Sequence, residues 1–173
     1  MRTKKLALMA LLTACALITF VIEAQIPPLT AIPGIKIGLS NIFTVFALWI
    51  MGPVSALGIL TIRVILGGLL TGQPATIIYS MAGGILSLVV SIAVKRLFKE
   101  DSVWALSAIA GVLHNIGQLM VAVWVTGTAA ITAYAPVLII SGIAAGSFTG
   151  LCAQLVIKRL RTIGRLPSSK YDK

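Results

Sequence analysis

Long apolar stretches alternate with short breaks along the whole chain, and the breaks are rich in proline, glycine or charge. Most stretches approach the roughly 20 residues that a helix needs to cross a bilayer. Short breaks with proline and glycine are typical of tight membrane hairpins. The pattern therefore predicts an all-α, polytopic membrane bundle of six transmembrane helices. The six stretches cover residues 6–26, 37–51, 54–71, 76–94, 103–125 and 135–157.

Composition supports one membrane domain. Of the 173 residues, 58% are hydrophobic and only 10% are charged, whereas a soluble domain of this size needs more polar surface. We expect a six-helix transmembrane domain over residues 1–162 and a flexible cytoplasmic tail over residues 163–173. Cys15 and Cys152 both fall within apolar stretches, so neither a disulfide nor a metal site is expected.

The first stretch has two interpretations. Arg2, Lys4 and Lys5 before an apolar run resemble the start of a signal peptide, and residues 12–15 resemble a lipoprotein processing box. The apolar run, however, continues to Ile26, where a mature lipoprotein would begin a polar tether. We therefore expect a retained first helix, with cleavage as the alternative.

The placement of the basic residues predicts the topology. The net charge of +10 would by itself fit a nucleic-acid-binding protein. All 14 lysine and arginine residues except Lys36 and Arg63, however, lie before residue 6, within residues 95–101 or after residue 157. Basic residues accumulate on the cytoplasmic side of membrane proteins. We expect a multi-pass protein of the bacterial plasma membrane, surrounded by lipid, with both ends cytoplasmic and no nucleic-acid partner.

Arg63 is the most informative polar residue, because it lies near the middle of the third stretch. Placing an arginine at that depth costs at least about 2.5 kcal/mol on insertion scales. The cost must be offset by an acidic partner, a water-filled cavity or a bound anion. Glu23 is the only acidic residue in any stretch. A buried pair with Glu23 and a contact with ligand both remain open.

His114, Asn115 and Gln118 form a second polar group in the fifth stretch. Spacings of three and four residues place them on one helix face. They either form hydrogen bonds between helices or line a cavity.

The predicted topology places the polar residues between the midplane and the outer surface. Arg63 and His114 are near the middle, whereas Glu23, Asn41 and Gln118 are nearer the outer side. The inner half is expected to be almost purely apolar. This layout predicts a pocket that opens outward.

Small residues recur at helical spacing in two stretches. They indicate close helix packing within the bundle, with docking to a partner membrane protein as the alternative for the first stretch. The series are Gly142, Gly146 and Gly150 in the last stretch and Ala7, Ala10 and Ala14 in the first.

Catalytic motifs are missing from the sequence. The only aspartates are Asp101 and Asp172, too few for a magnesium–diphosphate cluster, and no phosphate-binding P-loop is present. We expect no enzyme activity and no cofactor. Any ATP hydrolysis would come from another chain.

Three segments carry a family resemblance that extends from about Lys5 to Arg161. They are residues 33–42, Pro-Gly-Ile-Lys-Ile-Gly-Leu-Ser-Asn-Ile; residues 63–68, Arg-Val-Ile-Leu-Gly-Gly; and residues 114–118, His-Asn-Ile-Gly-Gln. The chain resembles the Gx transporter family, also called heptaprenyl diphosphate synthase component I. That family is similar to the S components of energy-coupling factor transporters, which are six-helix membrane proteins with an outward-facing binding pocket.

The resemblance to S components implies a mechanism. An S component binds a scarce small molecule, associates with a coupling protein and two ATPase subunits, and topples in the membrane to release its substrate. Ala10 and Ala14 match the face that docks to the coupling protein, and Lys36 and Asn41 match positions near ligand. We hypothesise an anionic substrate. The candidate substrate-binding residues are Glu23, Lys36, Asn41, Arg63, His114, Asn115 and Gln118.

The other family name supplies the alternative function. The chain would then be a non-catalytic membrane subunit of heptaprenyl diphosphate synthase, with a prenyltransferase partner, or a subunit of a quinone or flavin redox system. Prenyl elongation itself needs metal-bound diphosphate, for which this sequence lacks the acidic residues.

Overall fold

The computed structural model describes residues 2–26 and 38–164, and every regular element in these ranges is helical. The candidate residue Lys36 lies outside the described residues. The helices are α1 (Arg2–Glu23), α2 (Asn41–Ile50), α3 (Pro53–Leu70), α4 (Ala75–Val94), α5 (Val103–Thr126) and α6 (Ala135–Thr162), with short 3₁₀ turns η1 (Lys95–Leu97), η2 (Glu100–Ser102) and η3 (Ala129–Tyr134).

The prediction of an all-α membrane bundle is confirmed. Five of the described helices are long and apolar enough to cross a membrane, and α2 is apolar but shorter. With 10 residues, α2 extends only about 15 Å at 1.5 Å per residue, about half of the hydrocarbon thickness. The bundle therefore consists of five candidate spans around one short helix. The predicted second stretch is longer than α2 because it begins in the turn before that helix.

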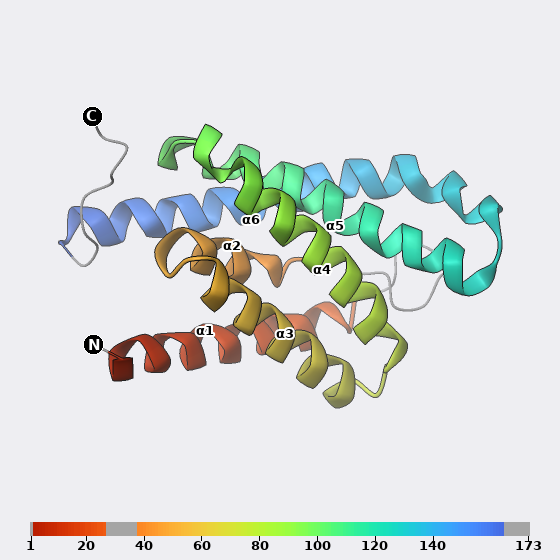
Figure 1. The fold of residues 1–173 in the computed structure, drawn as a ribbon, viewed down its shortest axis with the longest axis horizontal. Coiled ribbons are helices and arrows are strands. Elements are labelled where there is room, and N and C mark those ends of the chain that lie inside the picture. The colour runs from red at the N-terminus through yellow and green to blue at the C-terminus, as the bar shows by residue number, and fades with distance from the viewer. Residues whose placement is uncertain (1, 27–37, 165–173) are drawn as a thin grey trace.

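From α3 onward, each helix packs on the next one in the chain: α3 on α4, α4 on α5, and α5 on α6. α1 packs on α3, and α2 contacts α1, α3, α4 and α6 from the interior. Figure 1 shows that α1 begins and α6 ends at the same end of the bundle. We call this the terminal end. Its assignment to the cytoplasmic side stays a prediction.

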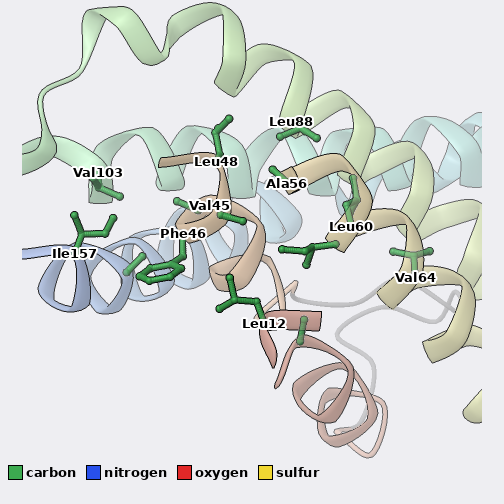
Figure 2. Packing of buried hydrophobic residues seen from close by; sticks show 14 residues of the cluster. Leu12, Val45, Phe46, Leu48, Ala56, Leu60, Val64, Leu88, Val103 and Ile157 are labelled. Atoms are coloured by element: carbon green, nitrogen blue, oxygen red, sulfur yellow. The ribbon is translucent and has the colours of Figure 1, made fainter. Parts of the chain in front are cut away.

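α2 is the centre of the main hydrophobic core. Its five consecutive residues from Thr44 to Leu48 are all buried, which requires contacts on every side of the helix. The connection from α2 to α3 ends at Gly52, which has φ +90°. Pro53 begins α3, and the first turn of a helix is a position that proline favours. Figure 2 shows how side chains from α1, α2, α3, α4, α5 and α6 meet there, among them Leu12, Phe46, Leu60, Leu88, Val103 and Ile157.

Lys95 caps the terminal end of α2. Its Nζ donates a 2.9 Å hydrogen bond to the Leu48 carbonyl oxygen and lies 4.9 Å from the centroid of the Trp49 ring. The last carbonyl groups of a helix have no partner within the helix and carry partial negative charge, so a lysine there is favourable. This contact ties the end of α4 to the central helix.

We expect Lys95→Met to lower the free energy of unfolding by about 1–2 kcal/mol, because it removes a charged hydrogen bond to a helix end while retaining an apolar stem. Lys99→Met is the matched control, since Lys99 is exposed. Thermal unfolding of both variants in detergent measures the difference. Equal stability of the two variants would show that the cap contributes nothing.

Glycines allow α5 and α6 to approach closely. A Cβ atom added to Gly111 would lie 2.3 Å from the Gly142 carbonyl oxygen, and one added to Gly146 would lie 2.4 Å from the Ser107 carbonyl oxygen. Real Cβ atoms do not approach that closely, so only glycine fits. The interpretation of Gly142, Gly146 and Gly150 as a packing face within the bundle is confirmed.

The alanine series of α1 behaves differently. Ala7, Ala10 and Ala14 all lie on the exposed face of the helix. Packing within the bundle is therefore wrong for this series, because α1 turns another face, with Leu12, Ala16 and Phe20, toward the core.

Candidate functional site

A sharp turn before α2 is the structural centre of the candidate site. Gly38 has φ +86°, a conformation that glycine adopts without the steric cost of a Cβ atom. Its N–H donates a hydrogen bond to Oε1 of Glu23 at the end of α1. The Asn41 N–H donates back to the Gly38 carbonyl oxygen at 3.0 Å. The turn is thus tied to α1 on one side and leads directly into α2.

Arg63 holds the other side of this turn from α3. Its guanidinium donates to Ser40 Oγ through Nη1 and to Asn41 Oδ1 through Nη2. Only 1% of the Arg63 surface is exposed. The planar donor fork of arginine suits such a two-point contact. Arg63 therefore fixes the start of α2 at a depth where an isolated charge would be unfavourable.

Glu23 and Arg63 compensate each other without direct contact. The two side chains share one pocket, and neither belongs to the ion pairs formed among the described residues, which join Lys158 to Asp101 and Arg161 to Glu100. Instead, each holds a different part of the Gly38–Asn41 turn. The arrangement is a buried charge pair bridged by backbone and polar side chains.

α4 and α5 complete the site where they cross at glycines. A Cβ atom on Gly83 would lie 2.4 Å from the His114 carbonyl oxygen and 3.1 Å from Gln118 Cγ. This contact brings the His114 ring against the turn, 3.2 Å from the position of a Gly38 Cβ atom. Gly83 therefore allows the close packing of α4 on α5, and that packing positions His114.

The pocket between these groups has a volume of about 190 Å³. It collects residues from four helices and the turn, and two of its members, Arg63 and Glu23, carry opposite charges. We call it the Arg63 pocket. It is lined by Phe20, Glu23, Gly38, Ser40, Arg63, Ser80 and His114.

Several buried polar atoms in or next to the Arg63 pocket have no hydrogen-bond partner among the described residues. They include Oε2 of Glu23, Nε of Arg63 and both amide atoms of Gln118, which is fully buried one helical turn beyond His114. Each buried, unsatisfied polar group costs about 1–3 kcal/mol, and such groups are few in native proteins. Several of these atoms gather at this cluster, which makes it the candidate binding site.

The structure brings together most of the residues predicted from sequence. Glu23, Asn41, Arg63 and His114 meet at the turn, and Gln118 lies one helical turn beyond His114. Asn115 instead faces α6. Its Nδ2 donates to the Leu138 carbonyl oxygen at 2.7 Å and to Ser141 Oγ at 3.2 Å. Of the two alternatives for this polar group, Asn115 therefore forms hydrogen bonds between helices.

Gly38, Ser40, Phe20 and Ser80 also belong to the site, and none of the four was predicted from the sequence. The signal for the first two is present in the sequence, because Gly-Leu-Ser-Asn before an apolar run is a turn pattern. Phe20 and Ser80 carry no such signal, since aromatic and hydroxyl side chains are common in membrane helices.

A second pocket of about 410 Å³ lies between α2 and the layer formed by α4, α5 and α6. It shares Gly38 with the Arg63 pocket, and its residues follow α2 from Asn41 to Leu48 toward the terminal end. We call it the hydroxyl-lined pocket, after Thr44, Ser87, Ser91, Ser107 and Thr149. The prediction that this half of the bundle is almost purely apolar is therefore wrong, because single hydroxyls on separate helices converge only in the fold.

We expect Gly38→Ala to lower the free energy of unfolding by more than the strain of a positive φ alone would. A Cβ atom there would lie 2.8 Å from Asn41 Nδ2, whereas Gly52, with nearly the same φ, has nothing within 4 Å. Both substitutions cost about 1–2 kcal/mol in backbone strain. Only Gly38→Ala also displaces Asn41 from Arg63. Unfolding measurements on the two variants should differ, and equal losses would contradict the geometry of the turn.

Clusters of metal-ligating side chains do not occur in the described part of the chain. Within residues 2–26 and 38–164, no group of three or more histidine, cysteine, aspartate or glutamate side chains could hold a metal ion.

Comparison with known proteins identifies a family. The family model described as heptaprenyl diphosphate synthase component I matches residues 12–156. No curated protein and no solved structure matches the chain significantly. The matched range includes Glu23, the Gly38–Asn41 turn, Arg63 and His114.

Proposed function

Because the chain belongs to the heptaprenyl diphosphate synthase component I family, we propose that it is a membrane-embedded binding subunit that works with partner chains. In this proposal it holds a small anionic molecule at the Arg63 pocket and performs no catalysis itself. The observation that carries the proposal is the concentration of unsatisfied, buried polar atoms around Arg63. A bound polar molecule would supply the partners that these atoms lack.

The chemistry of the pocket favours an anion. Arg63 uses two of its nitrogens on the turn, while its Nε has no partner within residues 2–26 and 38–164. A guanidinium binds carboxylates and phosphates through several donors at once. The Glu23 carboxylate accepts a hydrogen bond from the Gly38 N–H, whereas the Arg63 Nε–H is the donor that remains available to an anion.

The first form of the proposal is an S-component-like subunit of an uptake transporter. The exposed alanine face of α1, with Ala10 and Ala14, would dock to a coupling protein, and separate ATPase subunits would supply energy. Small residues let helices approach closely within a membrane. Lys36 belongs to this proposal as a further ligand contact.

The second form follows from the family description. Here the chain is the membrane subunit of a prenyl diphosphate synthase, and a prenyltransferase is its partner. A prenyl diphosphate is itself anionic, so the Arg63 pocket would serve either form. A role in a quinone or flavin redox system is a variant of this second form.

Gentle purification from membranes, followed by mass spectrometry of released small molecules and of co-purifying chains, tests the proposal. A water-soluble anionic metabolite with ATPase subunits supports the transporter form. A prenyl compound with a prenyltransferase supports the second form. A protein free of any anionic small molecule under conditions that preserve its fold would overturn the proposed binding function.

A further inference from the structure

The hydroxyl-lined pocket has a composition of its own. Five hydroxyl side chains reach it from α2, α4, α5 and α6, and all five belong to buried residues. The rest of the lining is apolar, with Val45, Leu48, Leu88 and Ala110. No charged side chain lines this pocket among the described residues. Such a surface suits an uncharged group that has both hydrogen-bonding atoms and apolar carbon.

Thr44 gives independent support for a ligand. Threonine hydroxyls in membrane helices usually donate to the carbonyl four residues earlier, as those of Thr13, Thr71 and Thr126 do here. The Thr44 hydroxyl is buried, lines the pocket and has no hydrogen-bond partner in the part of the chain that the structure describes. Leaving it unpaired is unfavourable, so its hydrogen-bonding capacity is available to a molecule in the pocket.

The two pockets are neighbours across the Gly38–Asn41 turn. Gly38 lines both pockets, and Asn41 lines the hydroxyl-lined pocket while its Oδ1 accepts a hydrogen bond from Arg63. The Arg63 pocket, at about 190 Å³, is less than half as large as the hydroxyl-lined pocket, at about 410 Å³. The charged group of a ligand is therefore assigned to the smaller space and its uncharged part to the larger one.

We propose that the hydroxyl-lined pocket binds the uncharged part of the same molecule whose anionic group is held at Arg63. This inference rests on the proposed function. The ligand class is then a compact carboxylate or phosphate ester with hydroxyl or carbonyl groups on a partly apolar body. Thr44 and Asn41 select for the uncharged groups, and Arg63 selects for the charge.

Cysteine labelling tests whether this pocket admits small neutral molecules. In a background with Cys15→Ala and Cys152→Ala, Ser91→Cys places a thiol in the pocket, and Ala93→Cys places one on the exposed face of the same helix. In lipid nanodiscs, neutral methyl methanethiosulfonate should modify Ser91→Cys about tenfold faster, because thiolate forms more readily in polar surroundings. Equal rates would overturn the assignment of the pocket as a binding site.

Binding of matched anion pairs tests the ligand class. The probes are carboxylates and phosphate esters, each compared with its analogue lacking the hydroxyl or carbonyl group, by isothermal titration. Wild-type protein should bind at least one oxygenated member about tenfold more tightly than its analogue. Thr44→Val, which has the same shape, should bring that ratio close to one without weakening the analogue. If Thr44→Val leaves this affinity ratio unchanged, the assignment of the hydroxyl-lined pocket is overturned, whereas the proposed anion binding at Arg63 is not.

The proposed function fails in a different way. If Arg63→Gln binds both members of a pair as wild-type protein does, the anion site is not at Arg63. If wild-type protein binds no probe of either kind, the proposed ligand class is wrong. Thr44→Val keeps the test interpretable, because removing an unpaired, buried hydroxyl leaves the fold intact.

Discussion

Replacing Arg63 by alanine is expected to lower the free energy of unfolding by about 3–5 kcal/mol, the range for removing one partner of a buried charge pair. The substitution leaves Glu23 without a compensating charge and leaves Ser40 and Asn41 without their donor. Denaturant unfolding in detergent, followed by helical circular dichroism, measures the loss. Arg96→Ala is the control, because Arg96 is exposed, and it should stay within about 0.5 kcal/mol of wild type.

A double variant separates charge compensation from simple loss of packing. Glu23→Gln with Arg63→Met removes both charges and preserves most of the side-chain volume. It should recover a large part of the stability lost in Arg63→Ala, because no unpaired charge remains in the membrane interior. If the double variant is as unstable as the sum of its single variants, Glu23 and Arg63 are not energetically coupled.

The second large effect is expected at the crossing of α5 and α6. Gly146→Leu forces a side chain into a space where even a Cβ atom would lie 2.4 Å from the Ser107 carbonyl oxygen. Overpacking of this kind costs about 3 kcal/mol or more when the neighbour is backbone that cannot move aside. The yield of folded, monodisperse protein after gel filtration and its melting temperature both report the loss.

Ala144→Leu is the matched control for this crossing. Ala144 is on the same helix and lies on the exposed face, so a larger apolar side chain there should change stability by no more than about 0.5 kcal/mol. If both variants lose a similar amount of stability, the cause is not the contact between α6 and α5, and α6 is intolerant of leucine for another reason.

The membrane bundle and much of the site could be predicted from sequence, for identifiable physical reasons. Apolar length predicts the five long spans but not the shortness of α2, and the cost of an arginine in hydrocarbon is enough to single out Arg63. The same cost explains why Glu23 lies in the pocket with it. The glycine series of α6 could also be interpreted correctly, because a small face every four residues has one main use, close packing.

Other features depend on how helices are placed in space. Asn115 and His114 are adjacent and equally polar, so the sequence does not distinguish them, but the helix turns them toward different neighbours. The hydroxyl-lined pocket was not predicted, because its five hydroxyl residues come from four helices. Ala7, Ala10 and Ala14 resemble the α6 glycines in spacing, yet they face away from the bundle.

Binding of a small anionic molecule at the Arg63 pocket can be tested by mass spectrometry of the small molecules that purified proteins release. Three proteins are compared: wild type, Arg96→Gln, and the double variant Glu23→Gln with Arg63→Met. We expect the same anionic compound at similar occupancy in wild type and Arg96→Gln, and its loss from the folded double variant. Retention of that compound by the folded double variant would contradict binding at Arg63.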